Sequence, residues 1–175
     1  MRYAELACRL CLLTVFVVAL AGKLSGKDAF AAFTRSLRQM SVIPQGTVAV
    51  AARASVAAEA LVVVLLAIPL RGAGAAGFAV AAGLLAVFTG AIVLSLRRGN
   101  VAPCRCFGAS STPLGARHVV RNVVLISLAL LGFGAALAPG PADLAGLLVA
   151  GAAGVVAGVT VTAFDDIAAL LRPAR

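Results

Sequence analysis

Residues 74–96 read GAAGFAVAAGLLAVFTGAIVLSL, and no charged side chain interrupts this stretch. At about 1.5 Å of rise per residue, a helix of this length crosses the hydrocarbon core of a bilayer. Arg71-Gly72 precedes the stretch and Arg97-Arg98 follows it, so cationic residues mark both of its ends. The stretch therefore predicts a transmembrane helix.

Further apolar segments lie on both sides of residues 74–96. Hydrophobic residues make up 62% of the 175 residues, and the mean hydropathy is +1.09. Soluble domains contain roughly 45–50% apolar residues, so the polar residues here cannot cover the apolar ones. The composition predicts an all-α integral membrane protein, a bundle of four to five transmembrane helices forming a single domain over residues 1–175. The expected spans are about 6–22, 47–70, 74–96, 118–138 and 144–164.

The first apolar segment, residues 6–22, has two interpretations. Arg2 and Arg9 precede most of it, and Ala19-Leu20-Ala21 fits the small-x-small pattern of a secretory cleavage site. The acidic Glu5 and the lack of a soluble domain after the segment favour a retained helix, with Arg9 close enough to its end to reach the headgroups.

Residues 28–40 differ in kind from the spans. Apolar residues recur at helical spacing on one side of this segment, and Arg35, Arg38 and Gln39 fall on the other. With Asp28 as the N-cap, the pattern predicts a short amphipathic helix lying in the membrane interface. The alternative is a helix packed on the bundle. The apolar positions are Phe30, Phe33, Leu37 and Met40.

The positive charge is distributed unevenly between the two faces of the membrane. The net charge of +9 is not gathered into one patch, which argues against nucleic acid as a partner. With five spans, one face receives only Arg2, Arg9 and Arg71. By the positive-inside rule the other face is cytoplasmic, so the amino terminus lies outside and the 97–117 loop inside. That face receives Lys23, Lys27, Arg35, Arg38, Arg53, Arg97, Arg98, Arg105, Arg117, Arg121, Arg172 and Arg175.

The 97–117 loop carries Pro103-Cys104-Arg105-Cys106-Phe107-Gly108. A Cys-x-Cys pair can close a small, strained disulfide ring, and strained disulfides are the exchangeable kind. Arg105 and the flanking arginines favour thiolate over thiol. Cys104 and Cys106 therefore predict a redox pair, with two loop cysteines of no role as the alternative. A metal site would recruit His118, but that set is incomplete for zinc and we predict no metal.

Glu59 lies inside the second predicted span. A carboxylate there costs on the order of a few kcal/mol unless it is paired or faces a polar cavity. Lys23 at the end of the first span, and Arg121 with Asn122 in the fourth, approach the same membrane face, and Ser55 shares the helix face of Glu59. We expect Glu59, Lys23 and Arg121 to form a polar pocket beneath the loop that can relay a proton. The alternative is a structural ion pair that pins the bundle.

Cys8 and Cys11 form a Cys-x-x-Cys pair within the first helix, near the opposite face. As a second redox pair they would be separated from the loop by on the order of 20 Å, so a diffusible carrier such as a quinone would be needed. Their alternative role is that of small apolar fillers, which is how buried free cysteine usually behaves.

The fifth span is rich in small residues. Gly154 and Gly158 form a small-xxx-small step, which permits close contact with another helix.

Several of these motifs occur in an order that resembles the methylamine-utilisation protein MauE family, itself related to DoxX-like membrane proteins. The resemblance runs from the first span through the fourth, and the Cys-x-Cys-Phe-Gly element is its most specific part. It rests on Ala21-Gly22-Lys23-Leu24 with Asp28-Ala29-Phe30, on Ala58-Glu59, on Cys104-Arg105-Cys106-Phe107-Gly108 with Ser110-Ser111, and on Val120-Arg121-Asn122.

The resemblance implies a role in maturation of the methylamine dehydrogenase small subunit, which is rich in disulfides, beside a thioredoxin-like partner. It also implies a multi-pass protein of a bacterial cell (inner or plasma) membrane. The role falls on Cys104 and Cys106, whereas Cys8 and Cys11 match nothing in the family pattern. The fifth span resembles an addition to a four-helix unit.

Together these features predict a membrane protein whose cytoplasm-facing loop supports thiol–disulfide exchange in maturation of a partner protein. This would make it a thiol–disulfide oxidoreductase, with Arg105 favouring the thiolate. One alternative is a non-enzymatic scaffold or chaperone, and another is a small-molecule or ion carrier that uses Glu59. Disulfide formation outside the cytoplasm would suit an outward loop; an inward loop fits exchange with a cytosolic thiol donor.

Overall fold

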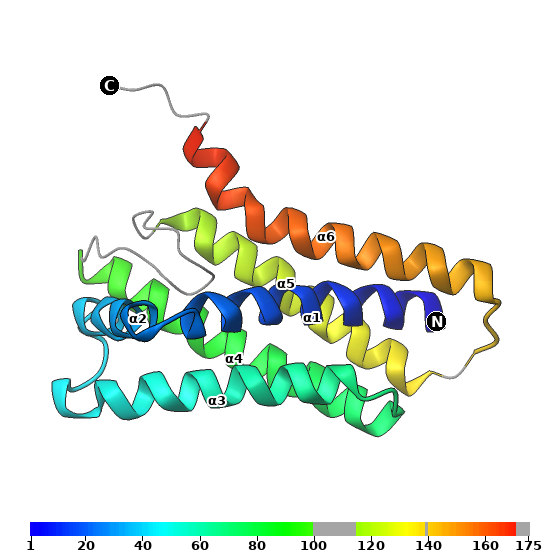
Figure 1. Cartoon of the computed structure of the whole chain (residues 1–175), viewed down its shortest axis with the longest axis horizontal. Helices are drawn as coiled ribbons and strands as arrows, with labels where there is room; N and C mark the ends of the chain where they lie inside the picture. Colours follow the sequence, from blue (N-terminus) through cyan, green and yellow to red (C-terminus); the bar gives the residue numbers. More distant parts are fainter. Residues whose placement is uncertain (100–114, 139, 171–175) are drawn as a thin grey trace.

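The structure, a computed structural model, describes residues 1–99, 115–138 and 140–170, without the side chains of residues 71 and 164–170. Cys104, Arg105 and Cys106 lie outside the described residues. The part that is described is helical, with no strand (Figure 1). Its elements are α1 (Arg2–Leu24), α2 (Lys27–Gln39), the short 3-10 helix η1 (Gln45–Thr47), α3 (Val48–Ala67), α4 (Arg71–Arg97), α5 (Ala116–Leu137) and α6 (Leu144–Leu170).

Five of these helices are long and apolar enough to cross a membrane, which confirms the predicted fold class. Their ends lie within about six residues of the expected ones. The largest difference is at the end of α6, which continues to Leu170. Helix α1 begins earlier than expected, at Arg2, and contains Glu5 and Arg9. These two side chains lie one turn apart with 3.8 Å between their charged groups, a spacing that supports a helix.

The long helices lie side by side around α1, which packs against α3, α5 and α6 (Figure 1). Helix α4 packs between α3 and α5. At one end of the bundle, α1 ends at Leu24 and α4 ends at Arg97. Helices α3 and α5 begin at the same end, at Val48 and Ala116. We call this the loop end, because the 97–117 loop leaves and rejoins the bundle there.

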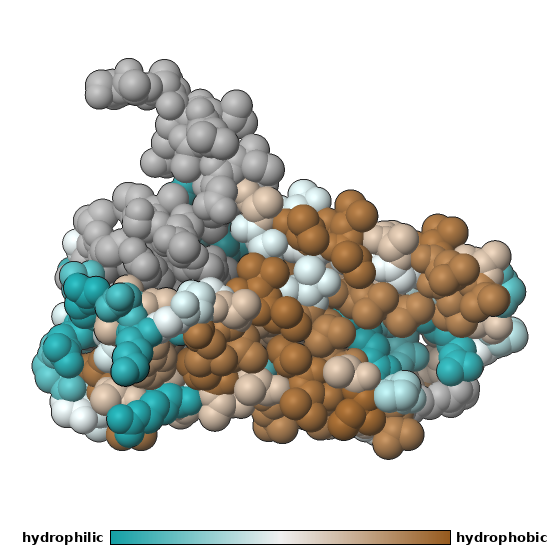
Figure 2. Space-filling model, in the orientation of Figure 1, coloured by the Kyte–Doolittle hydropathy of each residue, from teal (hydrophilic) through white to brown (hydrophobic). Residues whose placement is uncertain are grey.

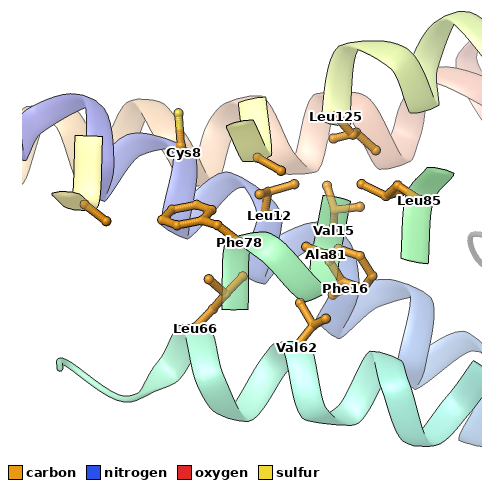
Figure 3. Packing of buried hydrophobic residues seen from close by; sticks show 12 residues of the cluster. Cys8, Leu12, Val15, Phe16, Val62, Leu66, Phe78, Ala81, Leu85 and Leu125 are labelled. Atoms are coloured by element: carbon orange, nitrogen blue, oxygen red, sulfur yellow. The ribbon is translucent and has the colours of Figure 1, made fainter. Parts of the chain in front are cut away.

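The core is an apolar cluster that joins α1 to α3, α4 and α5 (Figure 3). Leu12 and Phe16 of α1 are fully buried in it, as are Phe78 of α4 and Leu125 of α5. Gly132 of α5 lies directly against the Phe78 ring, where any larger residue would collide with it. Many large apolar side chains remain exposed on the outer surface. Figure 2 shows them gathered along the middle of one face, with hydrophilic side chains at its ends, as expected of a protein surrounded by lipid.

Helix α6 lies unusually close to α1. Gly154 faces the backbone of Ala7, and Gly158 faces the carbonyl oxygen of Cys11. Backbones can approach this closely only where one of them carries no side chain. The small-xxx-small step of the sequence thus lies in the α1–α6 contact.

Helix α2 is the short amphipathic helix that the sequence predicts, but it begins at Lys27 with Gly26 as the N-cap. The expected N-cap, Asp28, is wrong; Gly26 takes φ of 157°, a backbone conformation that favours glycine, and the helix starts one residue later. Phe33 and Met40 are buried against protein, and α2 packs on α1 and α3. Its apolar face therefore covers the loop end of the bundle.

Candidate functional site

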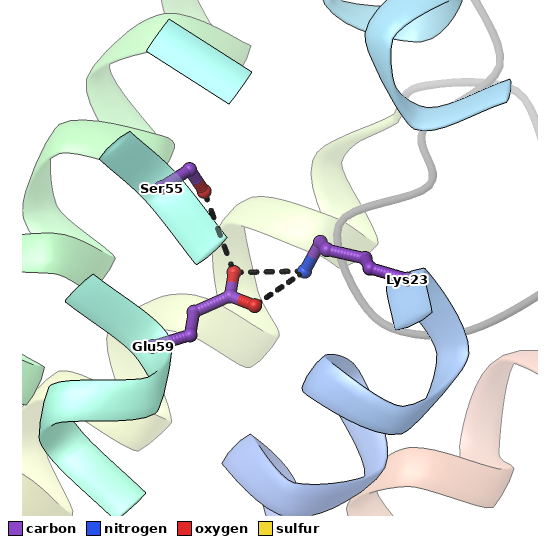
Figure 4. A network of polar contacts seen from close by, with 3 residues as sticks. All are labelled: Lys23, Ser55 and Glu59. Atoms are coloured by element: carbon purple, nitrogen blue, oxygen red, sulfur yellow. Dashed lines mark hydrogen bonds and ion pairs between the residues drawn. The ribbon is translucent and has the colours of Figure 1, made fainter. Parts of the chain in front are cut away.

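An ion pair between Lys23 and Glu59 lies inside the loop end (Figure 4). The Lys23 Nζ atom donates to both carboxylate oxygens of Glu59, at 2.7 Å to Oε1 and 2.9 Å to Oε2. The Ser55 hydroxyl, one turn earlier on α3, donates to Oε1 at 3.5 Å. Lys23 and Glu59 are each only 1% exposed, so the pair is dry.

Helical periodicity explains why Glu59 points inward. The buried residues of α3 recur at intervals of three and four, and Glu59 belongs to this stripe together with Ala52, Ser55, Val62 and Leu66. Glu59 is therefore carried to the α1 interface by the same face that buries the apolar core residues of α3. Lys23, in the last turn of α1, reaches it from the neighbouring helix.

The Lys23 ammonium has an aromatic cover as well. Its Nζ atom lies 4.9 Å from the centre of the Phe33 ring, within the range of a cation–π contact. Phe33 belongs to α2, which closes over this part of the bundle. The sequence pattern places Phe33 on the apolar face of α2 with Phe30, and no signal in it marks Phe33 as the ring that meets Lys23.

The energetics of the pair follow from its burial. Moving a carboxylate and an ammonium out of water costs several kcal/mol per ion, which their attraction offsets only with good geometry and further hydrogen bonds. The two short Nζ–oxygen contacts, the Ser55 hydroxyl and the Phe33 ring meet that need. These contacts account for the burial of both charges between α1, α2 and α3.

The other predicted site residues on α5 lie at the same end of the bundle. The contacts that the structure describes for Glu59 come from Lys23 and Ser55, whereas Arg121 lines a groove between α5 and α6. Asn122 is fully buried, and within the described part of the chain both polar atoms of its amide lack a hydrogen-bond partner. His118, next to it on the first turns of α5, is buried too.

Cys8 and Cys11 are free, buried thiols. Cys8 belongs to the apolar core, where Figure 3 shows it above the Phe78 ring, and Cys11 lies under α6 at the Gly158 contact. They occupy the position of apolar fillers, and a second redox pair stays a prediction. Among the residues that the structure describes, no group of three or more His, Cys, Asp or Glu side chains could hold a metal ion.

At the opposite end, Arg9 and Tyr3 each make polar contacts that no sequence motif predicts. Arg9 does not simply extend toward headgroups, because its Nε donates to the Leu66 carbonyl at 2.6 Å and a terminal nitrogen donates to the Ile68 carbonyl. It thereby satisfies carbonyl groups left open at the end of α3. Tyr3 donates its hydroxyl to Asp143, whose other oxygen accepts from the Gly146 N–H at 2.7 Å.

One comparison with known proteins covers the chain from α1 nearly to the end of α5. A family model described as methylamine utilisation protein MauE matches residues 1–135, which excludes α6. No curated protein and no solved structure matches the chain. Lys23, Glu59 and the 97–117 loop all lie within the matched residues, and the match covers well over half of the chain. The chain therefore belongs to the MauE family of methylamine utilisation proteins.

Proposed function

We propose that this multi-pass membrane protein supports thiol–disulfide exchange in the maturation of a partner protein. The family to which the chain belongs is described as methylamine utilisation protein MauE. The five candidate spans are consistent with a membrane protein that acts in methylamine utilisation. More specifically, we propose that the partner protein is the small subunit of methylamine dehydrogenase.

The observation that supports the proposal is the dry Lys23–Glu59 pair at the loop end. Ionisable residues inside a membrane are expensive and mark functional sites by default. This pair lies at the end of the bundle from which the segment with Cys104 and Cys106 leaves and to which it returns. A thiol that becomes a thiolate must release a proton, and Glu59 with Lys23 is a pair able to accept and return one.

The proposed step is an exchange with a partner disulfide. A thiolate from Cys104 or Cys106 attacks one partner sulfur, forming a mixed disulfide and releasing the other partner sulfur as a thiolate. The second loop cysteine then attacks the mixed disulfide and gives up its proton. The products are a Cys104–Cys106 disulfide and a partner dithiol, so two electrons pass to the partner. The reverse sequence oxidises the partner.

A thioredoxin-like protein is the proposed exchange partner, because it supplies or accepts the two electrons as a dithiol. We place the protein in a bacterial cell membrane with the loop in the cytoplasm, in accord with the distribution of lysine and arginine. If Cys8 and Cys11 also take part, a quinone is the class of carrier that could cross the distance between the two pairs.

A structural role of the ion pair is the second candidate function. It is favoured by the contacts of the Lys23 ammonium with Glu59 and with the Phe33 ring. These contacts hold α1, α2 and α3 together and enclose the ammonium on several sides. In that case the protein is a membrane scaffold for its partner, and the cysteines are dispensable.

The deciding experiment replaces the loop cysteines singly. Cys104→Ser or Cys106→Ser should abolish partner maturation, and one of the two should trap a mixed disulfide that is visible on a non-reducing gel. Cys8→Ala and Cys11→Ala, made in parallel, report whether the thiols of α1 are needed as well: normal maturation in both confines the chemistry to the loop, and a loss supports a second redox pair. Full maturation in both serine variants, at normal abundance, would remove the redox proposal and leave the scaffold.

A further inference from the structure

The interior of the bundle changes in character along its length. The apolar cluster of α1, α3, α4 and α5 fills its middle and its opposite end, whereas the buried polar side chains of the described residues lie toward the loop end. Three of them contact one another in the ion pair, and α4 and α5 bring further polar groups to the same end. The buried polar residues are Lys23, Ser36, Ser55, Glu59, Ser95, His118 and Asn122.

Asn122 brings both a donor and an acceptor into this interior. The side chain is 0% exposed, and neither Nδ2 nor Oδ1 has a hydrogen-bond partner within residues 1–99, 115–138 and 140–170. It belongs to the buried stripe of α5, one turn before Leu125, so it faces other helices and not lipid. A buried amide without a partner has given up its hydrogen bonds to water and gained nothing in return. Asn122 therefore calls for a ligand.

Ser95 of α4 is a second polar group of this kind. Its Oγ atom is fully buried and has no hydrogen-bond partner in the described part of the chain. Other hydroxyl groups in these helices donate to the carbonyl one turn earlier, as Thr89 does to Leu85 at 2.7 Å and Thr14 to Leu10 at 2.8 Å. Ser95 makes no such bond to its own helix, so its hydroxyl is open to a ligand in the interior.

The packing of α4 against α5 gives the spacing of the two groups. Ile92 of α4 and Val119 of α5 belong to one apolar cluster at the loop end, and the two helices run in opposite directions (Figure 1). Ser95 lies three residues beyond Ile92 toward the loop, and Asn122 lies three residues beyond Val119 toward the core. The two groups are therefore about six residues apart along the bundle, roughly 9 Å, so each needs a ligand of its own.

The neighbouring stretch of α1 leaves room beside Asn122. Val15 of α1 and Leu125 of α5 belong to the same core cluster (Figure 3), and these two helices also run in opposite directions. One turn closer to the loop end, α1 carries Ala19 and α5 carries Asn122. Ala19 is buried and has a small side chain, so a small molecule can lie next to the amide.

We propose that the interior at the loop end binds water, with one molecule held by the Asn122 amide and another by the Ser95 hydroxyl. Water is small, and it donates and accepts at once, as an amide and a hydroxyl both require. Buried water typically makes about three hydrogen bonds to polar groups that would otherwise be unsatisfied. The proposal goes beyond the thiol–disulfide function and does not depend on it, because both groups belong to α4 and α5 and neither is a cysteine.

The test is X-ray radiolytic labelling of the full-length protein in detergent, analysed residue by residue by mass spectrometry. A short X-ray pulse turns bound water into hydroxyl radicals, which oxidise adjacent side chains even where bulk water has no access. Leu125, one turn from Asn122, and Ile92, one turn from Ser95, should be oxidised although both are fully buried. Leu12 is the matched control, because it is equally buried but lies in the apolar cluster, further from the loop end.

Two variants assign each water to its residue. Asn122→Leu, which has nearly the same size, should remove the oxidation of Leu125 and leave that of Ile92. Ser95→Ala should remove the oxidation of Ile92 and leave that of Leu125. Each variant is thus the control for the other. Helical circular dichroism and a single elution peak establish that both are folded before their labelling is compared.

Oxidation of Leu125 and Ile92 no greater than that of Leu12 in the wild-type protein would overturn the proposal, and this comparison needs no variant. Unchanged oxidation of Leu125 in Asn122→Leu would overturn it as well, because the water would then be held by another group. An equal loss at both positions in either variant would indicate a general change in packing instead of two bound waters.

Discussion

A β-carbon added to Gly158 would lie 2.8 Å from the carbonyl oxygen of Cys11, closer than real side chains approach. It would also lie 2.8 Å from the Thr14 side chain. The missing side chain at position 158 thus sets the distance between α6 and α1. Because α6 also forms one wall of the groove beside α5, the same contact positions that wall.

Gly158→Ala should therefore destabilise the α1–α6 packing. Overpacking of a tight contact costs about 1–3 kcal/mol. Gly90→Ala is the matched control, because a β-carbon at this mid-helix position meets nothing within 4 Å and alanine is a better helix former there. Thermal unfolding in detergent compares the two, and an equal or higher midpoint for Gly158→Ala than for Gly90→Ala would contradict the close packing.

The Lys23–Glu59 pair should behave as a coupled unit. Lys23→Met or Glu59→Gln alone leaves a buried group without its partner and should cost about 3–5 kcal/mol. Lys23→Met combined with Glu59→Gln should recover much of that loss, because neither charge remains. A double-mutant cycle measured by unfolding gives the coupling, and additive losses would show that the pair contributes no coupling of its own.

The same variants separate the two candidate roles of the pair. If the double variant reaches normal abundance but no longer supports partner maturation, Glu59 and Lys23 have a chemical role beyond pinning the helices. If abundance and maturation recover together, their role is structural.

Asp143 gives the amino-terminal end of α6 a dependence on pH. Its hydrogen bonds from the Tyr3 hydroxyl and from the backbone N–H of Gly146 lower the pKa of its carboxyl group. A lowered pKa means that the stabilisation is present above the ordinary pKa, about 3.9, and is lost as the pH falls through the lower folded value. Tyr3→Phe should therefore lower the melting temperature at pH 7 and make a smaller difference at pH 3. An equal difference in melting temperature between the wild-type protein and Tyr3→Phe at pH 7 and pH 3 would contradict this prediction.

The loop cysteines should be accessible from the cytoplasm. In a Cys8→Ala, Cys11→Ala background, a membrane-impermeant maleimide should fail to label intact cells and should label inverted vesicles after reduction. Gly140→Cys, placed between α5 and α6 at the opposite end, is the control and should be labelled from outside. Labelling of Cys104 or Cys106 in intact cells would reverse the proposed orientation.

The sequence predicts structure best in the segments that cross the membrane, because lipid allows such a segment only one backbone conformation. Residues 74–96 can only be a helix if they cross a bilayer, since every backbone polar group must then be satisfied within the segment. The sequence predicts that Glu59 needs a polar partner because a carboxylate inside a span is costly, and it offers Lys23 as a candidate partner because Lys23 approaches the same face of the membrane. Each inference needs only the position of the residue along its own helix.

Other contacts depend on which helices become neighbours, which one sequence does not reveal. Phe33 meets Lys23 only because α2 folds back over α1, and its spacing alone suggested a lipid-facing ring. Arg9 satisfies carbonyl groups of α3 because α3 ends beside it, although nothing in its own segment indicates that partner. The groove between α5 and α6 likewise arises from two helices that share α1 as a neighbour.

The thiol–disulfide account is tested most directly by the redox state of Cys104 and Cys106 in cells. Cells are quenched in acid, and free thiols are alkylated with one maleimide before reduction and with a heavier one after it. The peptide with both cysteines is then analysed by mass spectrometry. The account predicts a fraction that carries only the heavier label and that grows when the exchange partner is deleted or trapped. A pair that is fully alkylated before reduction under every condition, with no disulfide-linked form, would contradict it.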